Sequence, residues 1–166
     1  MHFCMSEVER MDEIHLSETM EMPQIGQKCG QIAAIQNVHA EIDVAAEDEK
    51  CHAEGDILGE VIYICSRCLT TYPEKLVVSL DESFTTKEEA HDGAHLVSGD
   101  VVNLNPFIEQ ELFLGIEYRP LCSEECKGLC PECGCNRNEQ VCSCNTEKID
   151  PRLSVLKDLH LDADSE

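Results

Sequence analysis

The chain has 166 residues, which suits one domain of ordinary size with, at most, a small appended module. Its formal net charge is −22, from 34 acidic and 12 basic residues, and this argues against a protein that grips nucleic acid along the phosphate backbone. The acid excess favours a solvated, self-repelling surface, and the alternative is a surface for a basic partner. Tryptophan is absent and aromatics are 4%, so a core must be built from Val, Ile and Leu.

Cysteine usage points to metal or redox chemistry. No apolar run approaches the roughly 20 residues of a membrane-spanning helix, and MHFCMSEVER lacks the basic start and apolar stretch of a secretory signal. The expected location is therefore the cytoplasm, where disulfides are rare. Twelve cysteines in such a protein predict metal ligands or redox groups. The alternative is a secreted protein with a disulfide framework.

The first 30 residues are weakly patterned. They are predicted to form an ordered arm or a frayed helix, in which Ser6 and Glu9 make a capping box. Three cysteines stand alone here or just beyond and are interpreted as small apolar residues or free thiols: Cys4, Cys29 and Cys51.

Three segments with alternating polarity follow. Residues 37–44 and 51–64 are predicted to be half-buried strands, with Gly55 and Gly59 marking bends in the second. A third strand is expected over residues 75–84, after Pro73. Because only short turns separate them, the sequence predicts an antiparallel sheet.

A loop and a helix come next. Residues 85–100 have no periodicity and are predicted to be a mobile loop, with His91 and His95 solvated rather than bound to metal. Asn105 and Pro106 are predicted to open a helix that ends by Pro120. Its apolar stripe should pack on the sheet, and consists of Ile108, Leu112 and Ile116.

The expected fold is therefore α+β: an antiparallel β-sheet with a packed helix, then a cysteine-rich zinc knuckle and a short C-terminal helix opened by Asp150-Pro151. The expected divisions are an N-terminal arm (1–30), a core of sheet and helix (31–120), a cysteine-rich zinc module (121–146), and a C-terminal helix with its tail (147–166).

Eight cysteines form four close pairs, which are Cys65/Cys68, Cys122/Cys126, Cys130/Cys133 and Cys142/Cys144. Paired thiolates with a turn between them suit tetrahedral zinc, so four pairs predict two four-cysteine sites. The last two pairs are close enough in sequence to share one site, which leaves the first two pairs to share the other. Cys135 is interpreted as a spare thiol that could replace a neighbour. A single zinc ion, with Cys65 and Cys68 free, is the rival arrangement.

Other chemistry is compatible with some of these cysteines. Cys65-Ser-Arg-Cys68 could be a thiol redox pair in which Arg67 lowers a thiol pKa, and an electron-transfer iron–sulfur cluster is a further alternative. The radical S-adenosylmethionine spacing Cys126-x3-Cys130-x2-Cys133 is discounted, because too little chain follows for a barrel. No phosphate loop, nucleophile elbow or metalloprotease motif is present, and closed zinc sites offer no position for a reactive water. The prediction is a non-enzymatic protein, with a thiol redox or metal-dependent enzyme as the alternative.

The chain resembles the YceD family, the large ribosomal RNA subunit accumulation proteins. The resemblance runs over about residues 37–160 and rests on these pieces in order: CSRCL (65–69), ESF (82–84), GIEYRPLC (115–122), ECKGLCPECGCNRN (125–138), CSC (142–144) and DPRLSVLKDL (150–159). It implies a bacterial cytoplasmic role in 23S ribosomal RNA accumulation and large-subunit biogenesis, and genetic neighbourhood with a small ribosomal protein of that subunit.

The acidity limits the partners that fit such a role. Ribosomal proteins are strongly basic, so the expected partner is a basic ribosomal protein or a pre-ribosomal particle. Direct RNA contact would need a local patch, and five scattered basic residues near the cysteines and the last helix are the candidates: Arg67, Lys127, Arg137, Arg152 and Lys157.

Overall fold

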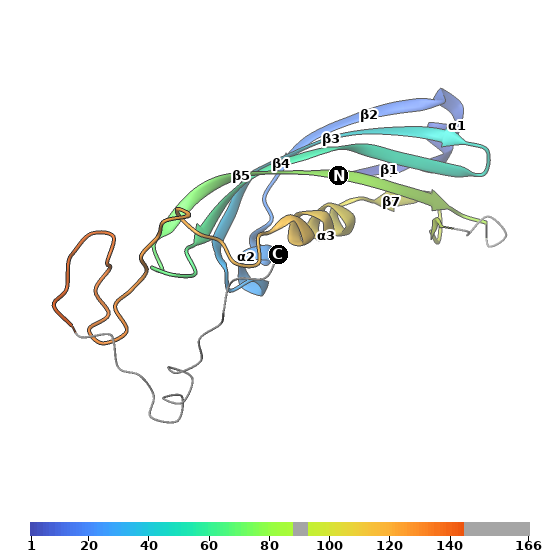
Figure 1. Cartoon of the computed structure of the whole chain (residues 1–166). Coiled ribbons are helices and arrows are strands. Elements are labelled where there is room, and N and C mark those ends of the chain that lie inside the picture. The colour runs from blue at the N-terminus through green and yellow to red at the C-terminus, as the bar shows by residue number, and fades with distance from the viewer. Residues whose placement is uncertain (88–92, 145–166) are drawn as a thin grey trace, which may run out of the picture.

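The structure is a computed structural model that describes residues 1–87 and 93–144. The helix expected from Asp150 lies outside the described residues. The elements, in chain order, are β1 (His2–Cys4), α1 (Met5–Met11), β2 (Glu13–Met20), α2 (Pro23–Lys28), β3 (Ile32–Glu47), β4 (Lys50–Ile64), β5 (Thr71–Thr85), β6 (His95–Leu96), β7 (Val101–Asn103) and α3 (Asn105–Gly115) (Figure 1). None of the helices within this described part is long and apolar enough to cross a bilayer.

The fold is α+β, as expected, and its centre is a five-stranded sheet in the order β2-β3-β4-β5-β6. Neighbouring strands are antiparallel except β5 and β6, which pair in parallel through Phe84 with His95 and Thr85 with Leu96. A second, two-stranded sheet joins β1 to β7. The three expected strands are therefore present as parts of β3, β4 and β5.

Four strands lie where the sequence analysis expects none: β1 and β2 in the expected N-terminal arm, β6 in the expected loop, and β7 just before the expected helix. β2 occupies part of the expected N-terminal arm and pairs with β3 over eight residues, from Glu13 opposite Ala45 to Met20 opposite Val38. β6 lies in the expected loop and is held by only two residue pairs. Ile14 and Leu16 pack against the core while His15 and Ser17 are exposed, so β2 carries the same alternation as the other strands over a shorter run.

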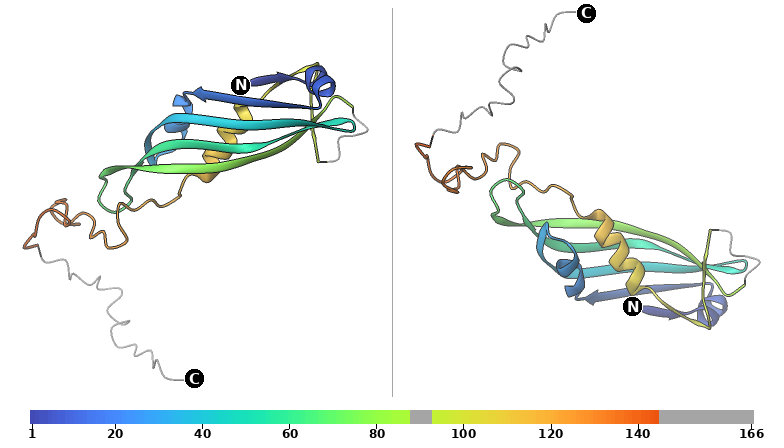
Figure 2. Two further views of the ribbon diagram at one scale, coloured as in Figure 1. Left: turned by 90° about the horizontal axis from the view of Figure 1, so that it is seen from above. Right: turned by 90° about the horizontal axis from the view of Figure 1, so that it is seen from below.

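One face of the sheet carries the core. Viewed from below, α2 and α3 lie in front of the strands, and viewed from above they lie behind them (Figure 2). The inward residues of the strands and helices form one apolar cluster, whose largest fully buried side chains are Phe84, Ile25, Ile42, Ile57, Leu80, Leu104, Ile108, Leu112, Val8, Val38, Val44 and Val61. The core is aliphatic, as the composition requires, with Phe84 packed edge-on against Phe3 and Phe107.

The predicted capping box of Ser6 and Glu9 is wrong, and although α3 begins at Asn105 as expected, the Asn105 side chain does not cap it. The N-cap of α1 is Cys4, with no side-chain cap, and Ser6 instead donates from its backbone N and its Oγ to the Asp100 carboxylate, at 2.8 and 2.7 Å. The N-cap of α3 is Leu104, while the Asn105 side chain accepts from the N-terminal ammonium of Met1. In each case a tertiary contact takes the polar side chain that the local pattern assigns to a cap.

Gly55 is required by the close approach of β3 and β4. A Cβ built there would lie 2.1 Å from the backbone oxygen of Glu41 and 2.8 Å from Cα of Ile42. Gly55→Ala should therefore destabilise the fold by about 2 kcal/mol or more, because backbone rather than a flexible side chain must move. The measurement is chemical denaturation, with Gly59→Ala as the matched control. At Gly59 the nearest atom is Ile35 Cδ1 at 3.5 Å, an ordinary contact, so equal loss in the two variants would contradict this account.

The opposite side of the sheet, called the open face below, is mostly polar. Its residues include, strand by strand, Glu13, His15, Ser17 and Thr19 in β2; His39, Glu41, Asp43, Ala45 and Glu47 in β3; Lys50, His52, Glu54, Asp56, Leu58 and Glu60 in β4; and Lys75, Val77, Ser79, Asp81 and Ser83 in β5.

His15 on the open face should titrate above the ordinary histidine pKa of 6.5. Its Nδ1 lies 2.6 Å from Asp43 Oδ1, and this hydrogen bond and the Asp43 charge both raise the pKa of His15. The sign follows: the stabilisation from protonated His15 is present below pH 6.5 and is lost as pH rises through the higher folded pKa. The measurement is an NMR titration of the ring. Asp43→Asn should lower the midpoint, whereas Asp56→Asn should leave it unchanged.

Candidate metal centres

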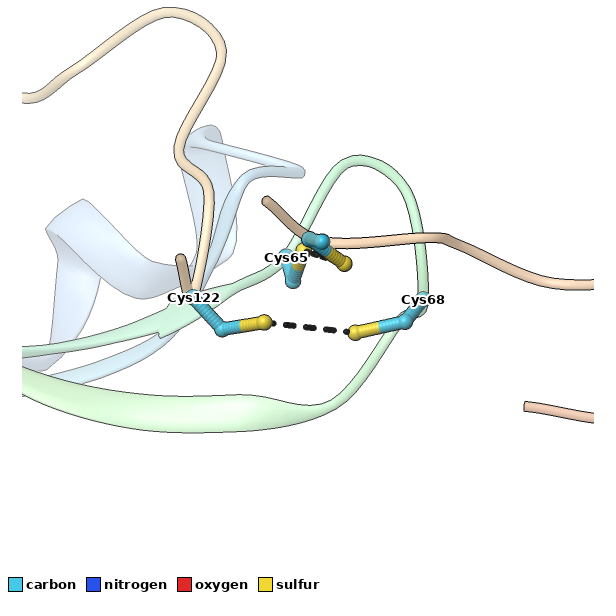
Figure 3. A group of neighbouring side chains, drawn as sticks. Cys65, Cys68 and Cys122 are labelled. Carbon is cyan, nitrogen blue, oxygen red and sulfur yellow. Dashed lines mark hydrogen bonds between the residues drawn. The ribbon is translucent and has the colours of Figure 1, made fainter. Parts of the chain in front are cut away.

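Four cysteines from two distant parts of the chain meet at the end of the sheet. The sulfur atoms of Cys65, Cys68, Cys122 and Cys126, called the first cluster below, all lie within 4.8 Å of one another. Cys68 Sγ is 3.6 Å from Cys122 Sγ, with Cys65 beside them (Figure 3). Cys65 Sγ is 3.8 Å from Cys126 Sγ. These separations are far longer than the roughly 2.05 Å of a disulfide. They match the edge of about 3.8 Å that a sulfur tetrahedron has when each Zn–S bond is about 2.3 Å.

The turn between β4 and β5 presents the first two thiols. β4 ends at Ile64, and the turn closes through Cys65 N to Thr70 O at 3.0 Å and Leu69 N to Cys65 O at 2.9 Å. Leu69 has a positive φ of 59°, which tightens this turn. The cysteine side chains are buried, with Cys65 at 0% and Cys68 at 5% exposure. The turn over residues 65–70, called the knuckle below, is therefore held by its own hydrogen bonds and by the long pairing of β4 with β5.

Arg67 and Gly128 attach the second cysteine segment to this knuckle. The Arg67 guanidinium donates to the backbone oxygens of Glu124, at 3.2 Å, and Cys126, at 2.9 Å. The Arg67 carbonyl in turn accepts from Leu129 N at 3.0 Å. Gly128 has a φ of 70°, and a Cβ there would lie 3.0 Å from the Arg67 oxygen. Arg67 is thus occupied by backbone contacts, and a glycine is needed where the two segments touch.

The surroundings favour negative sulfur at two members of the first cluster, Cys65 and Cys126, whereas the hydrogen bond from Cys68 and burial raise the pKa of Cys122 to about 12. Burial opposes ionisation of Cys65, but backbone N–H groups of Cys122, Cys68 and Arg67 outweigh it and lower the pKa of Cys65 to about 6. At Cys126 burial again opposes ionisation, and the Asn138 side chain and the Gly128 backbone lower the pKa. Asn138 Nδ2 donates to Cys126 Sγ at 3.3 Å. Thiolates that receive N–H donors are the ligands that zinc and related soft cations take.

Four further cysteines gather in the hairpin that follows. The sulfur atoms of Cys130, Cys133, Cys135 and Cys142, called the second cluster below, all lie within 4.8 Å of one another. The hairpin is closed by Cys130 N to Cys135 O at 2.9 Å and Gly134 N to Cys130 O at 2.8 Å, and Gly134 has a φ of 72°. Backbone N–H groups of Cys133 and Glu132 lower the pKa of Cys130 to about 6. Apart from Cys130, its thiols are less buried than those of the knuckle.

A fifth thiol adjoins the second cluster. The Cys144 side chain lies within hydrogen-bonding reach of Cys133 and Cys130, which together with burial raise the pKa of Cys144 to about 12. The sequence analysis expects Cys144 as a ligand and Cys135 as a spare. The structure instead brings Cys135 into the group of four and leaves Cys144 beside it. Five thiols therefore compete for four positions.

The isolated cysteines and His95 stand apart from both clusters. Cys51 is 1% exposed in the main core, and burial raises its pKa to about 11. Cys29 Sγ donates to Gln31 Oε1 at 3.3 Å. His95 Nε2 lies 2.7 Å from Glu82 Oε2 and its ring packs on Phe107. His91 lies outside the described residues, so its expected spacing with His95 is not tested.

Asn138 is the residue that the sequence analysis missed. Besides its bond to Cys126 Sγ, its Oδ1 accepts from Lys127 N at 2.8 Å, so one side chain links the hairpin of the second cluster to a thiol of the first. The segment CNRN gives no periodicity that would single it out. The only available signal is that asparagine is a frequent turn residue next to cysteine pairs.

Comparisons with known proteins assign most of the chain to one family. The family model described as "Large ribosomal RNA subunit accumulation protein YceD" matches residues 53–160, which include every cysteine of both clusters. A Bacillus subtilis protein named as uncharacterized, YlbN, is 30% identical over 148 residues, covering 86% of this chain and 85% of that protein. No solved structure matches the chain.

More distant relatives are longer. A Mycobacterium tuberculosis protein named as uncharacterized, Rv2926c, is 27% identical over 136 residues, covering 77% of this chain and 65% of its own length. An Arabidopsis thaliana protein named as a chloroplastic YCED homolog 1 of the large ribosomal RNA subunit accumulation proteins is 23% identical, over 74% of this chain and 48% of its own length. Since the family model covers well over half of the chain, this protein belongs to the YceD family of large ribosomal RNA subunit accumulation proteins.

Proposed function

We propose that this protein supports the accumulation of 23S ribosomal RNA, and so large-subunit biogenesis, in the bacterial cytoplasm, as a non-enzymatic factor stabilised by zinc. The observation that carries the role is the match to the family model over residues 53–160. Its expected partner is a basic ribosomal protein or a pre-ribosomal particle, because a chain of charge −22 repels free RNA.

Each cysteine cluster is proposed to hold one zinc ion. In the first, the ligands are Cys65, Cys68, Cys122 and Cys126, whose sulfur separations fit a zinc tetrahedron. In the second, the fixed ligands are Cys130, Cys133 and Cys142, with the fourth position supplied by Cys144 or Cys135. Four thiolates leave no open position on either ion, so the zinc would act on structure and not on a substrate. The cysteine-rich residues 121–146 would then form a module clamped to the sheet.

The role is tested in cells that lack the gene. The expected result is a fall in the ratio of large to small ribosomal subunits and in 23S relative to 16S ribosomal RNA, restored by the wild-type gene. The Cys4→Ser variant, whose thiol lies outside both clusters, should restore the ratio equally well. An unchanged subunit ratio in the deletion strain would contradict the proposed role, whatever the protein binds in vitro.

A second candidate is a thiol redox enzyme that uses Cys65 and Cys68. The lowered pKa of Cys65 favours it, because the thiolate is the reactive form. The two candidates differ in reactivity: zinc-bound thiolates should react slowly with a thiol reagent until a chelator is added, whereas a redox pair should react quickly in the metal-loaded protein. Rapid loss of two thiols with the zinc content unchanged would favour the enzyme.

A further inference from the structure

We propose that the open face of the sheet is the surface on which this protein holds a basic polypeptide segment with apolar side chains. The inference rests on the proposed function for the source of the partner, a ribosomal component. Its evidence is separate, and comes from the charges, the strand register and a hollow on the side of the sheet that the helices leave uncovered (Figure 2).

Carboxylates lie directly opposite one another across the open face. Asp43 of β3 faces Glu54 of β4, which faces Asp81 of β5, and the side chains are 51%, 72% and 81% exposed. In the next row Glu41 faces Asp56. Like charges directly opposite on neighbouring strands destabilise a sheet. The three strands β3, β4 and β5 therefore keep an arrangement that costs stability in the free protein and that positive charge from a partner would relieve.

The positive groups on the face are few and weak. Three histidines each lie close to carboxylates of the face. His15 Nδ1 is hydrogen-bonded to Asp43, and His39 Nε2 is 3.2 Å from Glu41. His52 Nε2 is 3.8 Å from Glu54 and 3.6 Å from Asp81. Two lysines lie on the described part of the face, Lys75 opposite Glu60 and Lys50 opposite Glu47 at the end of the strand pair. Near neutral pH these cations do not balance the carboxylates, so the face attracts lysine and arginine and repels phosphate.

An apolar shelf adjoins the acidic rows. Leu58 and Val77 lie opposite each other and are 44% and 60% exposed, although both belong to the solvent side of the sheet. They line a hollow of about 280 Å³ together with Asn37, Gly59, Glu60, Lys75 and Leu76. The hollow forms beside the irregularity in β3 between Gln36 and His39, where Asn37 has a φ of 53°. It can take an apolar side chain from a segment whose basic residues lie along the carboxylates.

These features select a basic polypeptide over other occupants. RNA is repelled by the carboxylate rows. A divalent cation needs several ligands converging on one point, and among the described residues the groups that converge in this way are the two cysteine clusters. A ribosomal protein carries lysine and arginine for RNA phosphates, so before it reaches RNA an acidic surface of this kind complements its charge.

The test uses the full-length, zinc-loaded protein and a fluorescent peptide rich in lysine and arginine with leucines interspersed, and measures the dissociation constant by anisotropy. The open-face variant replaces Glu41 and Glu54 by Gln and Asp56 and Asp81 by Asn. It should weaken binding roughly tenfold or more, and the salt dependence of binding should fall. The control variant replaces four exposed acidic residues away from the face by Gln: Glu7, Glu9, Glu124 and Glu125. It has the same net charge and should bind within about twofold of wild type.

The apolar shelf is tested separately. The double variant Leu58→Thr with Val77→Thr keeps the net charge. It should raise the dissociation constant of the peptide by about threefold or more at all salt concentrations. Folding is checked independently, because the open-face variant should melt at the same temperature as wild type or higher, once the opposed carboxylates are removed. An equal loss of peptide affinity in the open-face and control variants would overturn the proposal. Displacement of the peptide by single-stranded RNA that binds the open face would also overturn it.

The outcome is separable from that of the proposed function. In the deletion strain, the open-face variant should fail to restore the subunit ratio while keeping its zinc and its melting temperature. If it restores the ratio fully, the open face is not the docking surface, although the role in subunit biogenesis stands. If deletion leaves the ratio unchanged but the peptide still binds the face, the role fails and the binding surface remains.

Discussion

Cys126→Ser should remove one of two zinc ions and lower the free energy of unfolding by about 4 kcal/mol. This value is the chain entropy lost when a cross-link closes a loop as long as that between Cys68 and Cys122, which are 54 positions apart. The loss is large because the first cluster joins the β4–β5 turn to a segment that follows α3. Cys126 is also 5% exposed, and its sulfur accepts a hydrogen bond from Asn138 Nδ2. The shorter serine side chain would leave this donor without a well-placed acceptor.

This effect is measured by metal analysis and chemical denaturation on the same sample. Limited proteolysis should locate the damage, with new cleavage between the end of α3 at Gly115 and Cys144 while the sheet stays resistant. Cys4→Ser, a half-buried cysteine outside both clusters, is the matched control and should keep both ions. Retention of full zinc and full stability by Cys126→Ser would rule out the first cluster as a structural metal site.

Replacing Cys135 or Cys144 singly by serine should leave the zinc content unchanged, whereas the double variant should lose one ion. The reason is that five thiols surround a centre with four positions, so either residue can complete it when the other is absent. Cys130→Ser should behave differently, because this single substitution should be enough to release the ion. The Cys130 side chain is 2% exposed, and its sulfur receives backbone N–H groups that fix it as a ligand.

Zinc content per chain after passage over a weak chelator distinguishes these variants. The Cys135→Ser and Cys144→Ser variants should also exchange zinc more slowly than wild type. Each has four thiols left, so no fifth thiol is available to displace a bound ligand. Loss of the ion in Cys144→Ser alone would show that Cys135 is no substitute, and loss in Cys135→Ser alone would show the reverse. A wild-type protein with one ion only, which Cys130→Ser retains, would contradict the second centre itself.

Much of the fold follows from local pattern. Alternation over residues 37–44, 51–64 and 75–84 determines strands, because a sheet with one buried face requires period two. The same alternation is present in Ile14, His15, Leu16 and Ser17, so β2 was detectable in principle. The run is short and lies at the edge of the sheet, where none of its inward side chains is fully buried, so its pattern is weak. β6 could not be found, since two residues carry no period at all.

The candidate metal centres divide in the same way. The sequence by itself determined that cysteines occur in pairs. It also determined that any four-thiolate metal site at Cys65 and Cys68 must take its other ligands from far along the chain, because a short turn supplies only two. Only the tertiary structure decided that Cys135 joins the second cluster while Cys144 adjoins it. The direction of a side chain in a turn depends on backbone dihedrals such as the φ of 72° at Gly134, which spacing does not record. The open face is likewise tertiary, because which carboxylates oppose each other is a matter of register between strands, and that register is set by the buried side.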